Sequence, residues 1–232
     1  MTTSTSTSTP SSTTSTVVGI APTSTTTAAA SPTPTSPPAP TPPEDPPDAN
    51  PSIRAVTAED LYGSWRPGCP VDPSDLRLLT VTHVGFDGAD HTGAVVVHEA
   101  WAEELLAVFA ELHALGFPIE RMAPVDAFGG SDDASMAVNN TSGFNCRPVT
   151  GGAGWSRHAF GTAIDINPRQ NPYVTDDGQV LPPEGADHVE RSPAQGRIIR
   201  GEGVVEAFAA IGWQWGGDWT DPVDYQHFDI RP

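Results

Sequence analysis

Two histidines and an aspartate supply the donor atoms of a potential metal site in the second half of the chain. His158 and Asp165 lie in the segment Ser-Arg-His-Ala-Phe-Gly-Thr-Ala-Ile-Asp (residues 156–165), and His227 closes the string Asp-Tyr-Gln-His. Two imidazoles and a carboxylate suit Zn²⁺ and leave one coordination position open for water. Asp224, three residues before His227, is suited to accept a proton from that water. These residue types predict a hydrolytic zinc site.

The neighbours of Asp165 predict the direction of its side chain. Ile164 and Ile166 flank it, and side chains alternate between the two faces of a strand. With both isoleucines in the core, Asp165 faces a cleft, where a buried carboxylate is costly without a cation. Gly161 and Ala163 are small enough to let the chain pass close to a metal.

Other potential metal motifs in the chain are weaker. His98-Glu99 begins like the HExxH zinc helix, but Ala102 replaces the second histidine. The string Asp176-Asp177-Gly178 lacks the further ligands of a calcium loop and predicts a plain turn. The remaining histidines are interpreted as surface or core residues without a metal role: His83, His91, His98, His113 and His188.

Apolar patterning predicts the elements that must position the site. Residues 99–115 carry apolar side chains at helical spacing, and Gly116 followed by Pro118 ends that helix. The other expected elements are strands at 78–85, 92–97, 119–125, 163–167 and 227–230, a helix at 203–211, and loops at 127–147 and 171–191. Strands and helices do not alternate regularly, which favours an α+β fold with a small mixed or antiparallel sheet and flanking helices.

Residues 1–52 differ in composition from the rest of the chain. Ser, Thr, Pro and Ala dominate them, and they contain no Lys, Arg, His or aromatic residue. So little apolar surface cannot offset the chain entropy, and we predict a disordered tail or stalk. All six tryptophans lie after residue 60, and residues 53–232 are long enough to bury a core as one catalytic domain.

Cys69 and Cys146 stand alone, with neither in a CxxC pair. Behind a Ser/Thr/Pro-rich tail they predict one disulfide in an oxidising compartment, with two buried free thiols as the alternative. No stretch is long and apolar enough to span a membrane, and residues 17–21 are too short for the core of a signal peptide. The tail and the chemistry predict a secreted or cell-surface protein, although no signal peptide is visible.

The net charge is −18, and all eleven basic residues are arginines. An acidic surface argues against nucleic acid and anionic membranes as partners. The acidity itself mainly serves solubility, so it identifies no partner.

Longer strings accompany the metal-site motifs: Asp126-Ala-Phe-Gly-Gly, Asn140-Thr-Ser-Gly-Phe-Asn-Cys-Arg147, Asp165-Ile-Asn-Pro, Asn171-Pro-Tyr and Gly212-Trp-Gln-Trp-Gly-Gly-Asp-Trp. Together with Ser-x-His-x-x-Gly-x-Ala-x-Asp and the late Asp-x-x-His, they resemble the VanY-type D-alanyl-D-alanine carboxypeptidase family. The resemblance covers most of residues 66–230 and is strongest to its branch of L-alanyl-D-glutamate peptidases, which includes phage endolysins.

The resemblance implies a role for each matching position. His158, Asp165 and His227 would hold Zn²⁺, Asp224 would be the general base, and Arg147 would bind substrate or stabilise the developing oxyanion. Some relatives carry Glu where this chain has the shorter Asp224. Arg147 has an alternative interpretation as a surface ion pair. The implied fold is the small α+β scaffold of hedgehog signalling domains.

Residues around the site carry further expectations. Asp126 is a candidate for orienting a zinc-bound histidine. Trp213, Trp215 and Trp219 are candidates for lining a peptide cleft, with core packing as the alternative, favoured for Trp213.

The sequence as a whole predicts a monomeric zinc peptidase that cuts peptidoglycan stem peptides next to a D-amino acid. The cut would be that of a carboxypeptidase or of an L-Ala-D-Glu endopeptidase. Stem peptides carry carboxylates, which fits an arginine in the cleft of an acidic protein. The alternative is a non-catalytic zinc-bearing module that binds cell-wall peptides or a protein partner.

Overall fold

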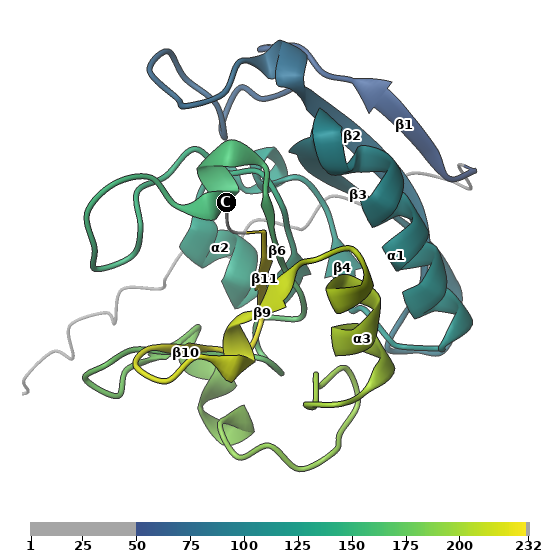
Figure 1. The fold of residues 1–232 in the computed structure, drawn as a ribbon, viewed down its shortest axis with the longest axis vertical. Coiled ribbons are helices and arrows are strands. Elements are labelled where there is room, and N and C mark those ends of the chain that lie inside the picture. Colours follow the sequence, from purple (N-terminus) through teal and green to yellow (C-terminus); the bar gives the residue numbers. More distant parts are fainter. Residues whose placement is uncertain (1–49, 231–232) are drawn as a thin grey trace, which may run out of the picture. The chain divides into compact units, whose positions relative to one another are not determined.

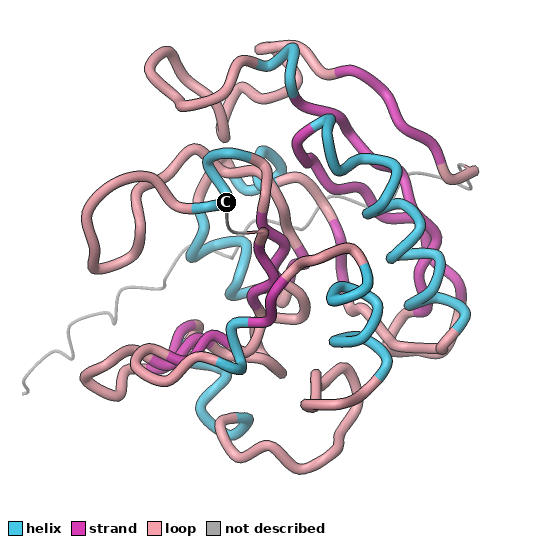
Figure 2. Tube along the Cα trace, in the orientation of Figure 1, coloured by secondary structure: helices cyan, strands magenta, loops and turns pink. Residues whose placement is uncertain are grey.

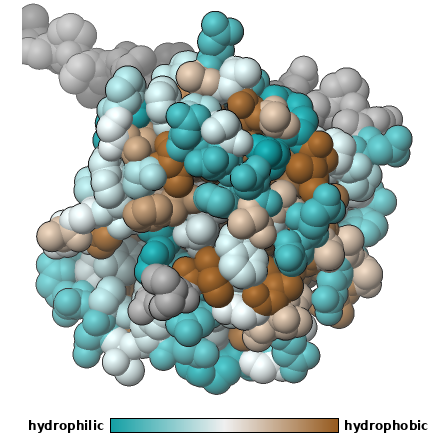
Figure 3. Space-filling view, turned by 45° about the horizontal axis from the view of Figure 1, so that its top comes forward, coloured by the Kyte–Doolittle hydropathy of each residue, from teal (hydrophilic) through white to brown (hydrophobic). Residues whose placement is uncertain are grey.

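The computed structural model describes residues 50–230. The predicted tail at residues 1–52 falls almost entirely outside this range. The described part mixes helices and short strands, which confirms the α+β class (Figure 1). None of its helices combines the length and the apolar character needed to cross a membrane. The face drawn in Figure 3 carries scattered apolar patches separated by hydrophilic residues.

The largest sheet is a three-stranded antiparallel one with the order β1-β2-β3, formed by Ser52–Ala55, Leu76–Val84 and Asp90–His98. The two long strands confirm the predicted strands at 78–85 and 92–97. Helix α1 (Ala102–Ala114) packs against β2, as Figure 1 shows. Its buried side chains recur at the predicted helical spacing: Leu105, Val108, Phe109 and Leu112.

A second antiparallel sheet, with the order β6-β11-β9, carries the predicted site. It consists of Ala163–Asp165, His227–Asp229 and Gln214–Trp215. Helix α3 (Gly203–Ala210) covers it, with the ring of Phe208 stacked 4.0 Å from that of Phe228 between centroids. Full burial of such a ring contributes about 2–3 kcal/mol. Helix α3 therefore stabilises the sheet by packing against its apolar side.

Shorter elements complete the described chain. Strand β4 (Arg121–Met122) pairs in parallel with β5 (Asn140–Thr141), and α2 (Asp132–Ala137) lies between them in sequence. A third antiparallel sheet has the order β10-β7-β8, formed by Val223–Asp224, Tyr173–Val174 and Val180–Leu181. Figure 2 shows how much of this half of the molecule is loop.

These short elements correct three expectations. The strand expected at 119–125 covers only Arg121–Met122, because Pro124 leads into a 3₁₀ helix. The loop expected at 127–147 contains α2, whose first turn is capped by the Ser131 hydroxyl, which accepts from the Ala134 N–H at 3.2 Å. The loop expected at 171–191 contains β7 and β8.

A disulfide joins Cys69 to Cys146 across 77 positions, which confirms the predicted bridge and rules out free thiols at these cysteines. Cys146 is buried beside Phe144 in a small second core under β3. The bridge ties the segment that leads to Arg147 to the beginning of the domain.

Candidate metal centre

The structure brings the three predicted metal ligands together. His158 Nε2 lies 3.0 Å from Asp165 Oδ2 and 3.2 Å from His227 Nδ1, and that atom lies 2.9 Å from Asp165 Oδ1. Donors about 2.0–2.1 Å from a tetrahedral Zn²⁺ are about 3.3 Å apart. All three side chains are buried, and within residues 50–230 they form the only group of three such side chains whose geometry suits a metal ion. The donor set and its spacing fit zinc.

Strand pairing explains why Asp165 and His227 meet. They are direct partners in the antiparallel pair of β6 and β11. Ile164 and Ile166 are fully buried in the main core, so the predicted alternation turns Asp165 the other way, into a cavity.

A short 3₁₀ helix, Arg157–Phe160, carries His158. The Ser156 hydroxyl caps it by accepting from the His158 N–H at 3.3 Å. Gly161 ends it with a φ of +67° and, through its carbonyl, accepts from the His98 N–H at 2.8 Å. A Cβ at position 161 would lie 2.6 Å from that His98 nitrogen, so only glycine permits this approach to β3.

An oxygen atom lies beside one nitrogen of each imidazole ring. His158 Nδ1 lies 2.6 Å from the Gly143 carbonyl, so this nitrogen donates and Nε2 is left free to bind a metal. On His227, Nε2 lies 3.7 Å from Asp229 Oδ2, and Nδ1 faces the centre. A backbone carbonyl such as that of Gly143 has no sequence signature. Asp229 does, because alternation along a strand puts it on the same face as His227.

Asp126 does not orient a histidine, which corrects that expectation. Its carboxylate accepts from the Gly63 N–H at 2.8 Å, the Ser64 N–H at 3.0 Å and the Ser64 hydroxyl at 2.6 Å. The Asp126 side chain therefore holds the segment at Gly63 and Ser64, near the start of the domain, by hydrogen bonds.

Electrostatics favour a positive charge among the three ligands. Burial would raise the pKa of Asp165, but the charges of His158 and His227 and their hydrogen bonds outweigh burial and hold this pKa well below its usual range. Burial opposes the protonated form of His227, yet its bonds to Asp165 and Asp229 raise its pKa to about 10. Such a carboxylate-rich site is suited to a cation.

Asp224 lies in β10 and shares a cavity of about 520 Å³ with all three predicted ligands. Its Oδ1 is buried without a hydrogen-bond partner among the described residues. Burial raises the pKa of Asp224 to about 7, with a contribution from the charge of Asp165, against the opposing charge of His227. Gly216 makes this approach possible, since a Cβ there would lie 2.5 Å from the Asp224 carbonyl oxygen and 3.3 Å from the His227 Cβ.

Arg147 fits both of its interpretations. Its Nη2 lies 3.0 Å from Asp132 Oδ2 in an ion pair, and its Nη1 donates to the Thr150 hydroxyl at 3.2 Å. The same side chain lines the cavity, and its Nε is buried without a partner among residues 50–230.

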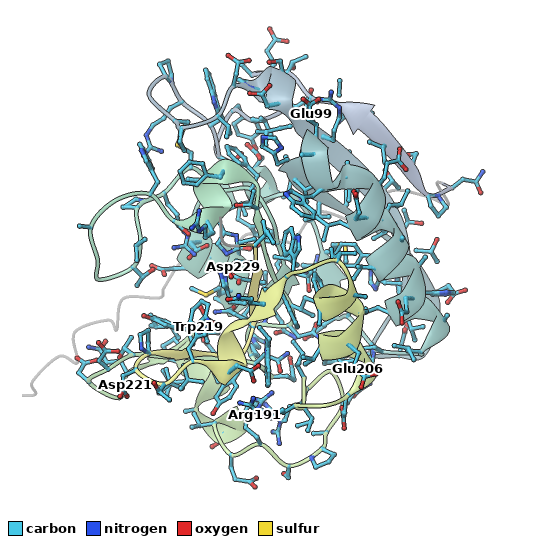
Figure 4. The ribbon with its side chains drawn as sticks, viewed as in Figure 1. Glu99, Arg191, Glu206, Trp219, Asp221 and Asp229 are labelled. Atoms are coloured by element: carbon cyan, nitrogen blue, oxygen red, sulfur yellow. A yellow bond between two sulfur atoms is a disulfide. The ribbon has the colours of Figure 1, made fainter. Side chains whose placement is uncertain are left out.

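The three candidate tryptophans have different surroundings. Trp213 is buried in the main core, as favoured. Trp215 is also in that core, where its Nε1 donates to the Tyr225 carbonyl at 2.9 Å, so its expected place in a cleft is wrong. Trp219 lines the cavity with its ring centroid 5.4 Å from that of His227. Figure 4 labels Trp219 and Asp229 in this central region.

Comparison with known protein families identifies the segment that holds these residues. Residues 150–230 match the family described as D-alanyl-D-alanine carboxypeptidase, a span that includes the three predicted ligands and Asp224. Over this span the chain is similar to that family. No curated protein and no solved structure matches the chain.

The match of residues 150–230 to the D-alanyl-D-alanine carboxypeptidase family confirms the predicted VanY-type resemblance. It points to a peptidase that acts on a peptidoglycan peptide. The L-alanyl-D-glutamate branch and the relation to hedgehog domains stay predictions.

Proposed function

We propose that this protein is a zinc-dependent peptidase that hydrolyses peptidoglycan stem peptides next to a D-amino acid. One observation carries the proposal: the donor atoms of His158, Asp165 and His227 converge in the cavity that also holds the partnerless carboxylate oxygen of Asp224. The match of residues 150–230 to a carboxypeptidase family supports the substrate class.

Each residue has a chemical task in this proposal. Zinc bound by the three ligands would supply Lewis acidity, which polarises a carbonyl and lowers the pKa of water. Asp224 Oδ1 accepts the proton from the attacking water and then returns it to the leaving amine. Arg147 lines the same cavity, and its planar guanidinium can donate to the substrate or to the developing oxyanion. Gly216 lets the short Asp224 side chain lie close to His227. Some relatives have the longer Glu at the position of Asp224.

The proposed setting is the outside of the cell. A disulfide within the domain supports an oxidising compartment. A secreted or cell-surface monomer with a Ser/Thr/Pro-rich stalk stays part of this proposal.

A non-catalytic zinc-bearing module that binds wall peptides or a protein partner is the competing function. Such a module has no use for a buried carboxylate oxygen without a hydrogen-bond partner in the cavity of its metal ligands. The costly burial of Asp224 therefore favours the peptidase.

Mass spectrometry of purified stem peptides tests the proposal. We expect the zinc-loaded chain to release a fragment whose mass identifies the bond, and a chelator to stop the release until zinc is restored. Asp224→Ala should lower kcat by about 10²- to 10⁴-fold while zinc content stays at the wild-type level. Asp218→Ala, which removes an exposed carboxylate from the same region, is the matched control with full activity.

A zinc-loaded, folded protein that retains stem peptides without cutting them would support the binding module instead. The binding module would also be supported if the wild type showed no turnover and the Asp224→Ala variant bound peptide and zinc as tightly as the wild type.

A further inference from the structure

The arginines of the described chain differ in what their guanidinium groups contact. Four form ion pairs with carboxylates: Arg54, Arg77, Arg147 and Arg200. Four others donate to backbone carbonyls: Arg66, Arg169, Arg191 and Arg197. In contrast, the guanidinium of Arg157 makes no hydrogen bond, ion pair or ring contact with any residue in the range 50–230, although Arg157 lines the cavity of the metal site.

The backbone of Arg157 is held in place while its side chain is left without a partner. Its carbonyl accepts from the Thr162 N–H and hydroxyl, both at 3.3 Å, and from Gly161 at the end of the 3₁₀ helix. The residue is only partly exposed and directly precedes the predicted ligand His158. Four other arginines also lack a carboxylate partner, but each of them donates to a backbone carbonyl, which Arg157 does not.

The two cavity arginines therefore differ in what they can offer a ligand. Asp132 neutralises Arg147, and Thr150 occupies a second of its donors. Arg157 keeps its whole planar fork of donors, which matches the two oxygens of a carboxylate.

We propose that Arg157 binds the terminal carboxylate of the peptide and so selects substrates whose scissile bond is the last one in the chain. The inference rests on the proposed peptidase function and deepens it, since it favours carboxypeptidase over endopeptidase cleavage. The free D-amino acid product leaves with the carboxylate that Arg157 holds.

Two peptides of identical sequence ending in D-Ala-D-Ala test this, one with a free carboxylate and one with a C-terminal amide. We expect the zinc-loaded wild type to prefer the free acid. Arg157→Gln should raise KM for the acid by roughly 10- to 100-fold, the worth of a hydrogen bond to a charged group, with kcat nearly unchanged and KM for the amide unaltered. Arg157→Lys should restore part of the preference, because it keeps the charge and loses the fork.

Arg54→Gln is the control, because it removes the same charge from an exposed ion pair. Equal use of both peptides by the wild type, or an equal loss on both peptides in Arg157→Gln, would overturn the role of Arg157 and leave the peptidase standing. Hydrolysis of neither peptide nor of any stem peptide by the wild type would overturn the proposed function and this inference with it.

Discussion

Two clusters of buried polar side chains have members close together in sequence, Asp165 in one and Asn167 in the other, and their atoms are satisfied in different ways. In the metal cluster, His158, Asp165 and His227, the donor atoms face one another at distances between 2.9 and 3.2 Å. In the asparagine cluster, Asn167 and Asn171, both amide atoms of each side chain bond outward to the surrounding loops.

Asn171 illustrates the second arrangement. Its Oδ1 accepts from the Ile198 N–H and from Arg191 Nη2, both at 2.8 Å, and its Nδ2 donates to three backbone carbonyls, at Ile166, Asn167 and Gly196. Arg191, labelled in Figure 4, also lies over the Tyr225 ring at 4.3 Å. Full pairing of buried amides holds loops in one conformation.

The contrast separates scaffold from site. Both clusters are buried and polar, so burial alone identifies neither as functional. Asparagines bonded outward connect loop segments, whereas two imidazoles and a carboxylate directed at one point leave room for a cation at that point. A change in one cluster should therefore alter stability, and a change in the other should alter metal binding.

The largest expected effect is that of Asp165→Asn. Asn has the same shape but no charge, so we expect the fold to remain while bound zinc and hydrolysis are both lost. Zinc at a thousand times its Kd should stabilise the wild type by about 4 kcal/mol, a rise in Tm of roughly 2–4 °C per kcal/mol, and this rise should vanish in the variant. Zinc content and thermal melting with and without zinc measure both effects. A variant that binds one zinc ion as tightly as the wild type would break the comparison.

The sequence predicted the metal cluster better than the asparagine cluster. His158, Asp165 and His227 have types and spacing that fit one chemistry, and the isoleucines beside Asp165 predicted its direction. Asn167 and Asn171 stood in recognisable strings, but their partners are backbone groups from distant loops, which no side-chain pattern records.

The wrong predictions for Asp126, Trp215 and the short strands also arise because the sequence pattern does not record which groups surround a residue. Asp126 has the residue type of a histidine partner, but which N–H groups lie near it depends on how the start of the domain folds back. Trp215 lies in a glycine-rich string that is compatible with a cleft position as well as with the core position that the structure shows. Strands of two residues, such as β7, β8 and β10, are too short to show any periodicity.

The disulfide should have the next largest effect, because it closes a long loop of the chain outside both clusters. A bridge that closes a loop of this length contributes about 4 kcal/mol through the unfolded chain. We expect Cys69→Ser combined with Cys146→Ser to melt well below the wild type. Activity should fall with it, since Arg147 directly follows Cys146. The wild type with a reductant is the control, and melting unchanged under oxidising conditions would contradict the prediction.

Asn171→Ala should have the smallest of the three effects and sharpens the comparison most. The substitution leaves buried partners of both amide atoms unsatisfied, at about 1–3 kcal/mol for each lost group, so we expect unfolding to be easier by about 3 kcal/mol. The zinc-dependent rise in Tm should nevertheless match that of the wild type, because no atom of Asn171 belongs to the metal cluster. Chemical unfolding and zinc titration of the same samples give the two numbers. If Asn171→Ala lost zinc affinity while Asp165→Asn lost only stability, the roles assigned to the two clusters would have to be exchanged.

A loss of both properties in each variant would instead mean that the two clusters depend on each other. The asparagines would then hold the metal ligands in place through the short segment that joins Asp165 to Asn171.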